Sequence, residues 1–168
     1  SVNTYTVTIK AGSYGSVNKT SITSVAYGTS VSTNSNVLTI GSTTVTATPT
    51  AADGYTTKFS SWSNVPTTIT GAVTIMANFT RTGITYYVKY NANGGTGTAM
   101  ANSTHTYGTA KNLTANTYKK TGYTFTGWAK SSTATTYEFT DKHSVSTLTT
   151  QSGETFNLYA VWSANKYY

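Results

Sequence analysis

Residues that could carry out acid–base chemistry are scarce in this 168-residue chain. Its carboxylates are Asp53, Glu138, Asp141 and Glu154, and its imidazoles are His105 and His143. General acid–base catalysis needs a positioned titratable group, commonly one of a pair. Two of the four carboxylates, Asp53 and Glu154, stand beside a glycine, which is typical of turns. We interpret both as turn residues.

Asp141 and His143 lie two positions apart and could suggest a catalytic dyad or a metal pair. No other histidine, cysteine or clustered acid lies nearby in the sequence, so a metal site would lack ligands. Capping and exposure to solvent are the favoured interpretation. The run Gly94-Gly-Thr-Gly97 lacks the Gly-Lys-Ser/Thr of a phosphate loop and is read as a hairpin turn. Serines lack a Gly-x-Ser-x-Gly context. The sequence therefore predicts no enzyme, and no catalytic, cofactor-binding or metal-binding residue.

A covalent Lys–Asn isopeptide bond is an alternative that the sequence leaves open. Such a bond needs a lysine and an asparagine on adjacent strands beside a buried carboxylate. The candidates are Lys10 or Lys89 with Asn78, and the second half of the chain has Val161 where the first has Asn78. Lys89 is also out of phase with the inward side of its strand. We do not favour this bond.

Positive charge is the one property that could select a partner. Lysine and arginine number 11 against 4 acids, which gives a net charge of +7. Such a surface attracts teichoic acids, sulfated glycans, anionic membranes or nucleic acid through the same Coulomb term. The single arginine, Arg81, argues against nucleic acid. The candidate polyanion-binding residues lie in the second half: Lys111, Lys119, Lys120, Lys130 and Lys142. The alternative is a solvated basic surface that only aids solubility.

Aromatic residues provide a second possible contact. The chain has 14 Tyr, and Tyr118, Tyr137 and Tyr167 lie outside the hydrophobic pattern. Tyr118 and Tyr137 are candidates for stacking on sugar rings, or they cover the edge of the core. With no cysteine, the fold does not rely on disulfides. No stretch reaches the ~18 apolar residues of a membrane span. No signal peptide opens the chain, and we expect a piece of a longer polypeptide.

The elements that must position these residues occur twice. Four anchors recur in the same order, with most copies about 80 residues apart, as expected of repeat architectures. The anchor pairs are Tyr5 and Tyr86, Tyr27 and Tyr107, Trp62 and Trp128, and Phe79 and Trp162. We predict two tandem modules, residues 3–80 and 85–163, joined by a linker at 81–84. A linker this short favours a semi-rigid arrangement.

Strands dominate the local pattern. Each module opens and closes on alternating apolar residues, which is typical of half-buried strands. Asn91-Ala-Asn-Gly-Gly95 predicts a tight turn because asparagine and glycine tolerate positive φ. The Phe-x-x-Trp spacing requires a bulge at Thr126-Gly127, and one at Ser60-Ser61 in the first module. Asp141 to Leu148 could form one short helix.

Five motifs of the second module, in order, carry a resemblance to a known family. They are Tyr-x-Val-x-Tyr-Asn-Ala-Asn-Gly-Gly, Tyr-Gly-Thr-Ala-x-Asn-Leu, Gly-Tyr-Thr-Phe-Thr-Gly-Trp, Ser-Val-Ser-x-Leu-Thr and Leu-Tyr-Ala-x-Trp. Residues 86–163 resemble the Listeria–Bacteroides repeat, the B repeat of internalin B. Residues 3–80 resemble a divergent copy, which lacks Asn-Gly-Gly and Ser-Val-Ser.

This resemblance implies a mainly β fold (α+β, β-grasp-like), with at most one short helix in each module. It also implies an extracellular, secreted or wall-associated parent protein and no catalytic residues. The expected function is a non-enzymatic, adhesin-like repeat segment that acts as a semi-rigid spacer and adheres to anionic or glycan surfaces. The alternative is a specific carbohydrate- or protein-binding module. Expected partners are cell-wall or host anionic glycans or a host surface protein, with no nucleic acid and no membrane span. The fragment is expected to be monomeric.

Overall fold

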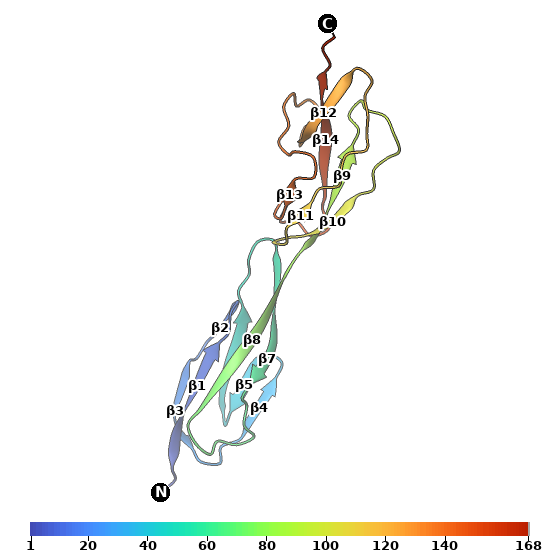
Figure 1. Ribbon diagram of the computed structural model, residues 1–168. Helices are drawn as coiled ribbons and strands as arrows, with labels where there is room; N and C mark the ends of the chain where they lie inside the picture. The colour runs from blue at the N-terminus through green and yellow to red at the C-terminus, as the bar shows by residue number, and fades with distance from the viewer. Residues whose placement is uncertain (168) are drawn as a thin grey trace. The chain divides into compact units, whose positions relative to one another are not determined.

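The computed structural model describes residues 1–167, and the chain divides into two compact units, Ser1–Thr82 (unit 1) and Gly83–Tyr168 (unit 2). Throughout the described residues the regular secondary structure is strand, and no helix occurs (Figure 1). The mainly β expectation is confirmed, in line with the many β-branched and aromatic residues, which prefer strands. The α+β and β-grasp-like parts of the expectation are not supported, because the described residues contain no helix.

Unit 1 contains two four-stranded sheets. Its strands are β1 (Thr4–Ala11), β2 (Gly15–Val17), β3 (Ser21–Ala26), β4 (Val31–Asn34), β5 (Val37–Ile40), β6 (Thr43–Pro49), β7 (Tyr55–Ser63) and β8 (Val73–Gly83). One sheet has the order β3-β1-β8-β7 and the other β2-β6-β5-β4. The two sheets share one core: Ile9 and Ile75 from the first pack with Leu38 and Val45 from the second. Ile69, from the loop between β7 and β8, completes it.

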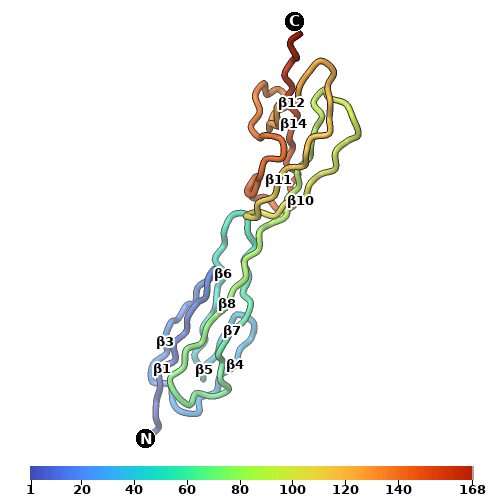
Figure 2. Tube along the Cα trace, viewed as in Figure 1, coloured from blue at the N-terminus to red at the C-terminus, as the bar shows by residue number. Residues whose placement is uncertain are grey.

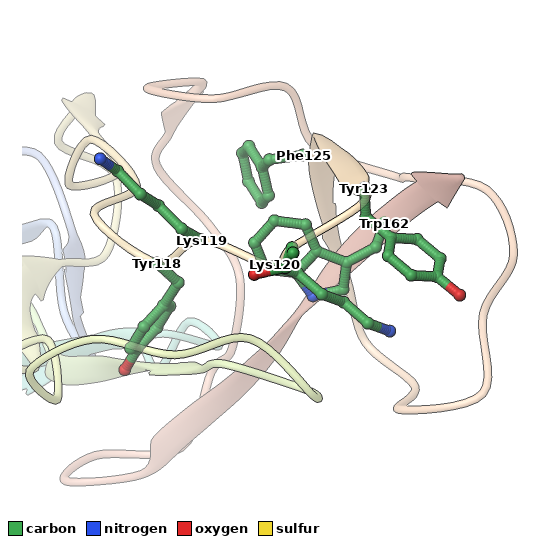
Figure 3. Close-up of a pocket in the computed structure, with 7 residues that line it drawn as sticks. Tyr118, Lys119, Lys120, Tyr123, Phe125 and Trp162 are labelled. Carbon is green, nitrogen blue, oxygen red and sulfur yellow. The ribbon is translucent and has the colours of Figure 1, made fainter. Parts of the chain in front are cut away.

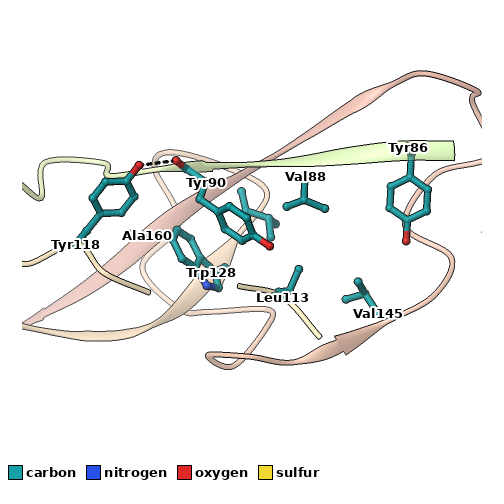
Figure 4. Packing of buried hydrophobic residues seen from close by; sticks show 9 residues of the cluster. Tyr86, Val88, Tyr90, Leu113, Tyr118, Trp128, Val145 and Ala160 are labelled. Atoms are coloured by element: carbon teal, nitrogen blue, oxygen red, sulfur yellow. Dashed lines mark hydrogen bonds between the residues drawn. The ribbon is translucent and has the colours of Figure 1, made fainter. Parts of the chain in front are cut away.

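Unit 2 contains one four-stranded sheet and a short two-stranded one. Its strands are β9 (Thr85–Asn91), β10 (Ser103–Thr106), β11 (Lys111–Asn112), β12 (Tyr123–Ala129), β13 (Ser144–Val145) and β14 (Thr155–Ala164). The main sheet has the order β10-β9-β14-β12, and β11 pairs with β13. Tyr86, Val88 and Tyr90 of β9 form the centre of its core with Trp128 and Leu158 (Figure 4).

The main sheets of the two units follow the same plan. In each, the first and last strands lie parallel at the centre, β1 with β8 and β9 with β14, and one further strand lies on each side. Of these outer strands, β3, β10 and β12 pair antiparallel with their neighbours. The register also corresponds. Ile9 faces Ile75 in unit 1, and their counterparts in the repeated sequence, Tyr90 and Leu158, face each other in unit 2. The repeat read from the sequence is therefore also a repeat of strand order and register.

The second layer differs between the units. In unit 1 it comes mainly from β4, β5 and β6, which lie between the second and third strands of the main sheet. In unit 2 the covering strands, β11 and β13, lie on either side of β12 in the sequence, and a long irregular segment runs from β12 to β13 (Figure 2). The shifted spacing of the two Phe-x-x-Trp motifs reflects this difference.

The helix expected over 141–148 is not formed. Lys142 has a φ of 59°, which no helix tolerates, and Ser144–Val145 pairs with β11 instead. Serine and threonine are poor helix formers, and Asp141 accepts a hydrogen bond from the Asn116 N–H at 2.9 Å instead of capping a helix. Residues 81–83, expected as linker, belong to β8.

Two local predictions are confirmed. The register of β12 against β14 shifts between Phe125 and Gly127, and Gly127 has a φ of 153°, so the strand bulges there. In the Asn-Gly-Gly turn, Asn93 and Gly94 both have positive φ, and the Gly95 N–H donates to the Ala92 carbonyl at 3.0 Å.

Candidate functional site

The bulge in β12 brings three aromatic rings of unit 2 together. Because the bulge resets the alternation, Phe125 and Trp128 turn to the same side of the sheet, with ring centroids 5.0 Å apart. Phe125 also meets Trp162 of β14, its partner in the ladder, edge to face at 5.7 Å. Trp128 is fully buried, whereas Phe125 and Trp162 are only partly buried. The outer two rings therefore remain within reach of solvent.

A pocket of about 370 Å³ opens over these outer rings (Figure 3). Its lining combines aromatic and basic side chains: Tyr118, Lys119, Lys120, Thr121, Tyr123, Phe125 and Trp162. The volume lies within the range of about 300–1,000 Å³ that is usual for small-molecule sites. No carboxylate lines it, and its two charged residues are both lysines.

Lys120 and Tyr123 form the charged side of the pocket. The Lys120 ammonium lies 4.1 Å from the centroid of the Tyr123 ring, close enough for a cation–π interaction. A turn with Gly122 at a φ of 79° and a hydrogen bond from the Tyr123 N–H to the Lys120 carbonyl (3.0 Å) sets this pair. Tyr123 remains 41% exposed. In Figure 3 the Lys119 and Lys120 side chains extend in different directions.

The Asn-Gly-Gly turn fixes Trp162, which forms the floor of the pocket together with Phe125. Trp162 Nε1 donates to the Ala92 carbonyl at 3.0 Å, and Asn93 Nδ2 donates to the Ala160 carbonyl at 3.0 Å. Gly95 lies directly against the indole: a Cβ there would be 2.5 Å from Trp162 Cζ2. The motif thus fixes the orientation of the last aromatic ring.

The predicted polyanion-binding lysines do not all meet at one place. Lys119 and Lys120 line the pocket. Lys130 pairs with Glu138 at 3.8 Å, and Lys111 donates to the Thr104 carbonyl at 2.7 Å. Lys142 lies exposed in its own turn. The structure therefore singles out two of the five for a shared site.

The two candidate stacking tyrosines have opposite environments. Tyr118 is only 7% exposed, so the expectation that it lies outside the core is wrong. Its hydroxyl donates to the Tyr90 carbonyl at 2.8 Å, drawn in Figure 4, and accepts from the Met100 N–H at 3.0 Å. Tyr137 is 50% exposed, and so is accessible as expected. It lies outside the pocket lining.

Sequence reasoning missed Tyr123, Phe125 and Trp162 as site residues. All three belong to motifs that were read as core positions. The signal that could have marked Tyr123 is its place directly after the turn glycine Gly122, at the first position of β12, where a side chain is still exposed. Lys120, three residues earlier, is brought to the Tyr123 ring by that turn.

Unit 1 carries a related cluster at the corresponding place. Phe59 contacts both Trp62 (5.5 Å) and Phe79 (5.9 Å), as Phe125 contacts its two neighbours in unit 2. The cation here is Arg81, whose guanidinium lies 4.4 Å from the Tyr14 ring centroid and 5.8 Å from that of Tyr55. Arg81, expected in a linker, is therefore part of unit 1.

A buried polar chain runs beside the unit 2 core. The Thr114 N–H donates to the Tyr90 hydroxyl (2.8 Å), which bonds Ser103 Oγ (2.7 Å), which in turn bonds His105 Nε2 (2.7 Å). The two side-chain bonds can run in either direction, so either neutral tautomer of His105 fits the chain. Burial lowers the pKa of His105, and the charge of Lys111 lowers it further. His105 is 1% exposed and stacks on Tyr86 at 5.3 Å, so it serves the fold.

The remaining histidine and Glu154 lie at exposed positions of the described chain. His143 is exposed, and the Thr149 hydroxyl donates to Glu154. Within residues 1–167, no three acidic, histidine or cysteine side chains gather closely enough to hold a metal ion. Lys10 and Lys89, candidates for a covalent bond, are exposed and lack the buried setting that such a bond needs. The described chain contains no helix long and apolar enough to cross a membrane.

Comparison with known proteins identifies one family. No curated protein matches the chain. The region that a family model recognises contains the motifs of the second half up to Val161, most of the paired strands β9 and β14, and the Phe125 and Trp128 rings, whereas Trp162 lies one residue beyond it. Residues 86–161, most of unit 2, match the Listeria-Bacteroides repeat domain, as the sequence motifs predict.

Proposed function

We propose that this chain is a non-enzymatic repeat segment of a microbial cell-surface protein, acting as a semi-rigid spacer that also adheres to anionic glycan surfaces. The match to the Listeria-Bacteroides repeat domain carries this proposal, because these repeats occur in extracellular or surface proteins. The chain holds a second unit with the same strand order and register, as expected of an array built by repetition.

The short connection between the two units supports the spacer role. β8 ends at Gly83 and β9 begins at Thr85, so a single residue separates the two strands. A connection without a glycine- or proline-rich linker favours limited flexibility. A non-catalytic role is supported by the carboxylates of the described chain, which bind neighbouring side chains or backbone groups, or lie in turns. Glu138, for example, binds Lys130 and accepts from the Lys130 N–H.

Adhesion is supported by charge. The net charge of +7 comes from only 15 charged side chains, so few acids compensate the lysines. A surface of this kind attracts polyanions, and the attraction weakens as salt screens it.

Binding to heparin, lipoteichoic acid and a panel of neutral glycans, each at low and near-physiological salt, tests the proposal. We expect binding to the two polyanions that falls as salt rises. Salt-resistant binding to one neutral glycan would favour the alternative, a specific carbohydrate-binding module. The aromatic pocket supports that alternative. Binding to none of these ligands would refute the adhesive part of the proposal and leave a spacer alone.

A further inference from the structure

The pocket of unit 2 combines two recognition chemistries. One side presents the partly buried rings of Phe125 and Trp162, and the other presents an ammonium and the exposed ring of Tyr123. We propose that this pocket binds an acidic sugar unit, a uronic acid or a sulfated sugar within a polysaccharide. This inference rests on the proposed adhesion to glycans and names the ligand class and the residues.

The rings match the apolar face of a sugar. A pyranose ring exposes C–H groups on its faces, and such a face packs against an aromatic ring while its hydroxyls stay in water. Phe125 and Trp162 are held edge to face at 5.7 Å, and Trp162 is fixed by its hydrogen bond to the Ala92 carbonyl. These contacts hold the two rings in place before any ligand binds, which lowers the entropic cost of binding.

The ammonium selects a negative group on that sugar. Lys120 stands beside the Tyr123 ring, and no hydrogen bond or ion pair engages its ammonium among residues 1–167. Its three N–H donors are thus available to a carboxylate or sulfate. With no acid in the lining, a bound anion meets no like charge. A simple polyanion would leave the rings unused, and a neutral sugar would leave the ammonium unused.

Unit 1 offers an internal comparison. The cation beside its ring cluster, Arg81, comes from β8 and already donates to Thr57 Oγ1 at 3.0 Å and to the Thr50 carbonyl at 2.7 Å. That guanidinium ties β8 to neighbouring segments of its own unit. The cation beside the rings is thus engaged within unit 1, whereas the Lys120 ammonium remains available in unit 2, so we assign the binding to unit 2.

Four probes and two pairs of matched variants test this assignment in the full chain. The probes are a polyuronate, a sulfated polysaccharide, inorganic polyphosphate as an anion without sugar rings, and dextran as a neutral sugar polymer. The pocket variants are Lys120→Gln and Tyr123→Ala. The controls, Lys142→Gln and Tyr137→Ala, remove the same groups from exposed sites outside the pocket.

We expect one or both acidic polysaccharides to bind more tightly than polyphosphate and dextran. Each pocket variant should weaken that binding about tenfold, equivalent to about 1.4 kcal/mol, whereas the controls leave it nearly unchanged. Tyr123→Phe, which keeps the ring, should retain binding. The urea midpoint of each variant checks that it is folded.

Two results would overturn the inference in distinguishable ways. If polyphosphate binds as tightly as the acidic polysaccharides, or the controls weaken binding as much as the pocket variants, the pocket is not the site, although charge-driven adhesion survives. If none of the four probes binds, the proposed adhesion fails together with the pocket.

Discussion

Acid should destabilise unit 2 through a single buried imidazole, that of His105. The folded unit keeps this ring neutral, because burial and the nearby charge of Lys111 lower its pKa from 6.5. It is packed between Tyr86 and Ser103, with Nε2 engaged and Nδ1 without a hydrogen-bond partner in the described chain. The unfolded chain takes up a proton near pH 6.5 and the folded chain does not.

The loss of stability in acid is set by the uptake of one proton on unfolding. Below pH 6.5 the unfolded state holds more protons, so the free energy of unfolding falls as pH falls. The full stabilisation is present above pH 6.5, and the loss approaches about 1.4 kcal/mol for each pH unit until the folded imidazole also protonates. For a domain of this size, about 1.4 kcal/mol lowers the melting temperature by roughly 6 to 11 °C.

Urea unfolding at pH 7.5 and pH 5.5, followed by tryptophan fluorescence, measures this loss. A Trp62→Phe background leaves only the two tryptophans of unit 2 as reporters. His105→Gln should flatten the pH dependence, while His143→Gln, at an exposed ring, should preserve it. For each variant the change in the free energy of unfolding between the two pH values is compared, because a change in packing alters stability at both pH values alike. A His105→Gln protein that keeps the full loss on acidification would refute the reasoning.

Two further substitutions test contacts within unit 2. Gly95→Ala places a Cβ 2.5 Å from Trp162 Cζ2 and should lower the free energy of unfolding by about 1–3 kcal/mol. The control Gly71→Ala, in unit 1, has open space around the new Cβ and should be neutral or slightly stabilising. Thermal melting compares the two variants. An unchanged melting temperature for Gly95→Ala would contradict the close packing. Tyr118→Phe removes a buried hydroxyl with two backbone partners and should cost about 1–3 kcal/mol, while Tyr137→Phe should cost almost nothing; equal urea midpoints would contradict this.

The sequence was sufficient where a local rule controls the structure. The alternation of Val7 and Ile9 predicts a strand with a buried side, and both residues are fully buried. The bulge at Gly127 follows from geometry alone, because two rings three positions apart must share one core. The Asn-Gly-Gly turn follows from residues that tolerate positive φ.

Non-local contacts explain the failures. Tyr118 stands in a stretch of threonine and lysine with no apolar periodicity, and it is buried through bonds to Met100 and Tyr90, which lie 18 and 28 positions away. Arg81 was predicted to lie in a linker because its partners are distant in the sequence: Tyr14 stands just before β2 and Thr50 just after β6. The segment after Asp141 pairs with β11, a partner that no local pattern reveals.

For a similar reason, the sequence predicted the lysines of the candidate site but not its aromatic rings. Charge clustering in the sequence pointed to Lys119 and Lys120, which the structure places in the pocket lining. The rings that complete the pocket belong to motifs whose regularity indicates burial. That Phe125 and Trp162 are only partly covered depends on how the surrounding loops close over them.

The central pair of strands also determines how each unit would respond to mechanical tension. The first and last strands of each unit lie parallel, with Val7 to Ala11 facing Val73 to Ala77 in unit 1 and Tyr87 to Asn91 facing Thr155 to Tyr159 in unit 2. A pull that draws the two ends of a unit apart slides these strands along each other. Their hydrogen bonds are then loaded together in shear and cannot open one after another. Such a segment resists force best along the direction in which its own chain is stretched.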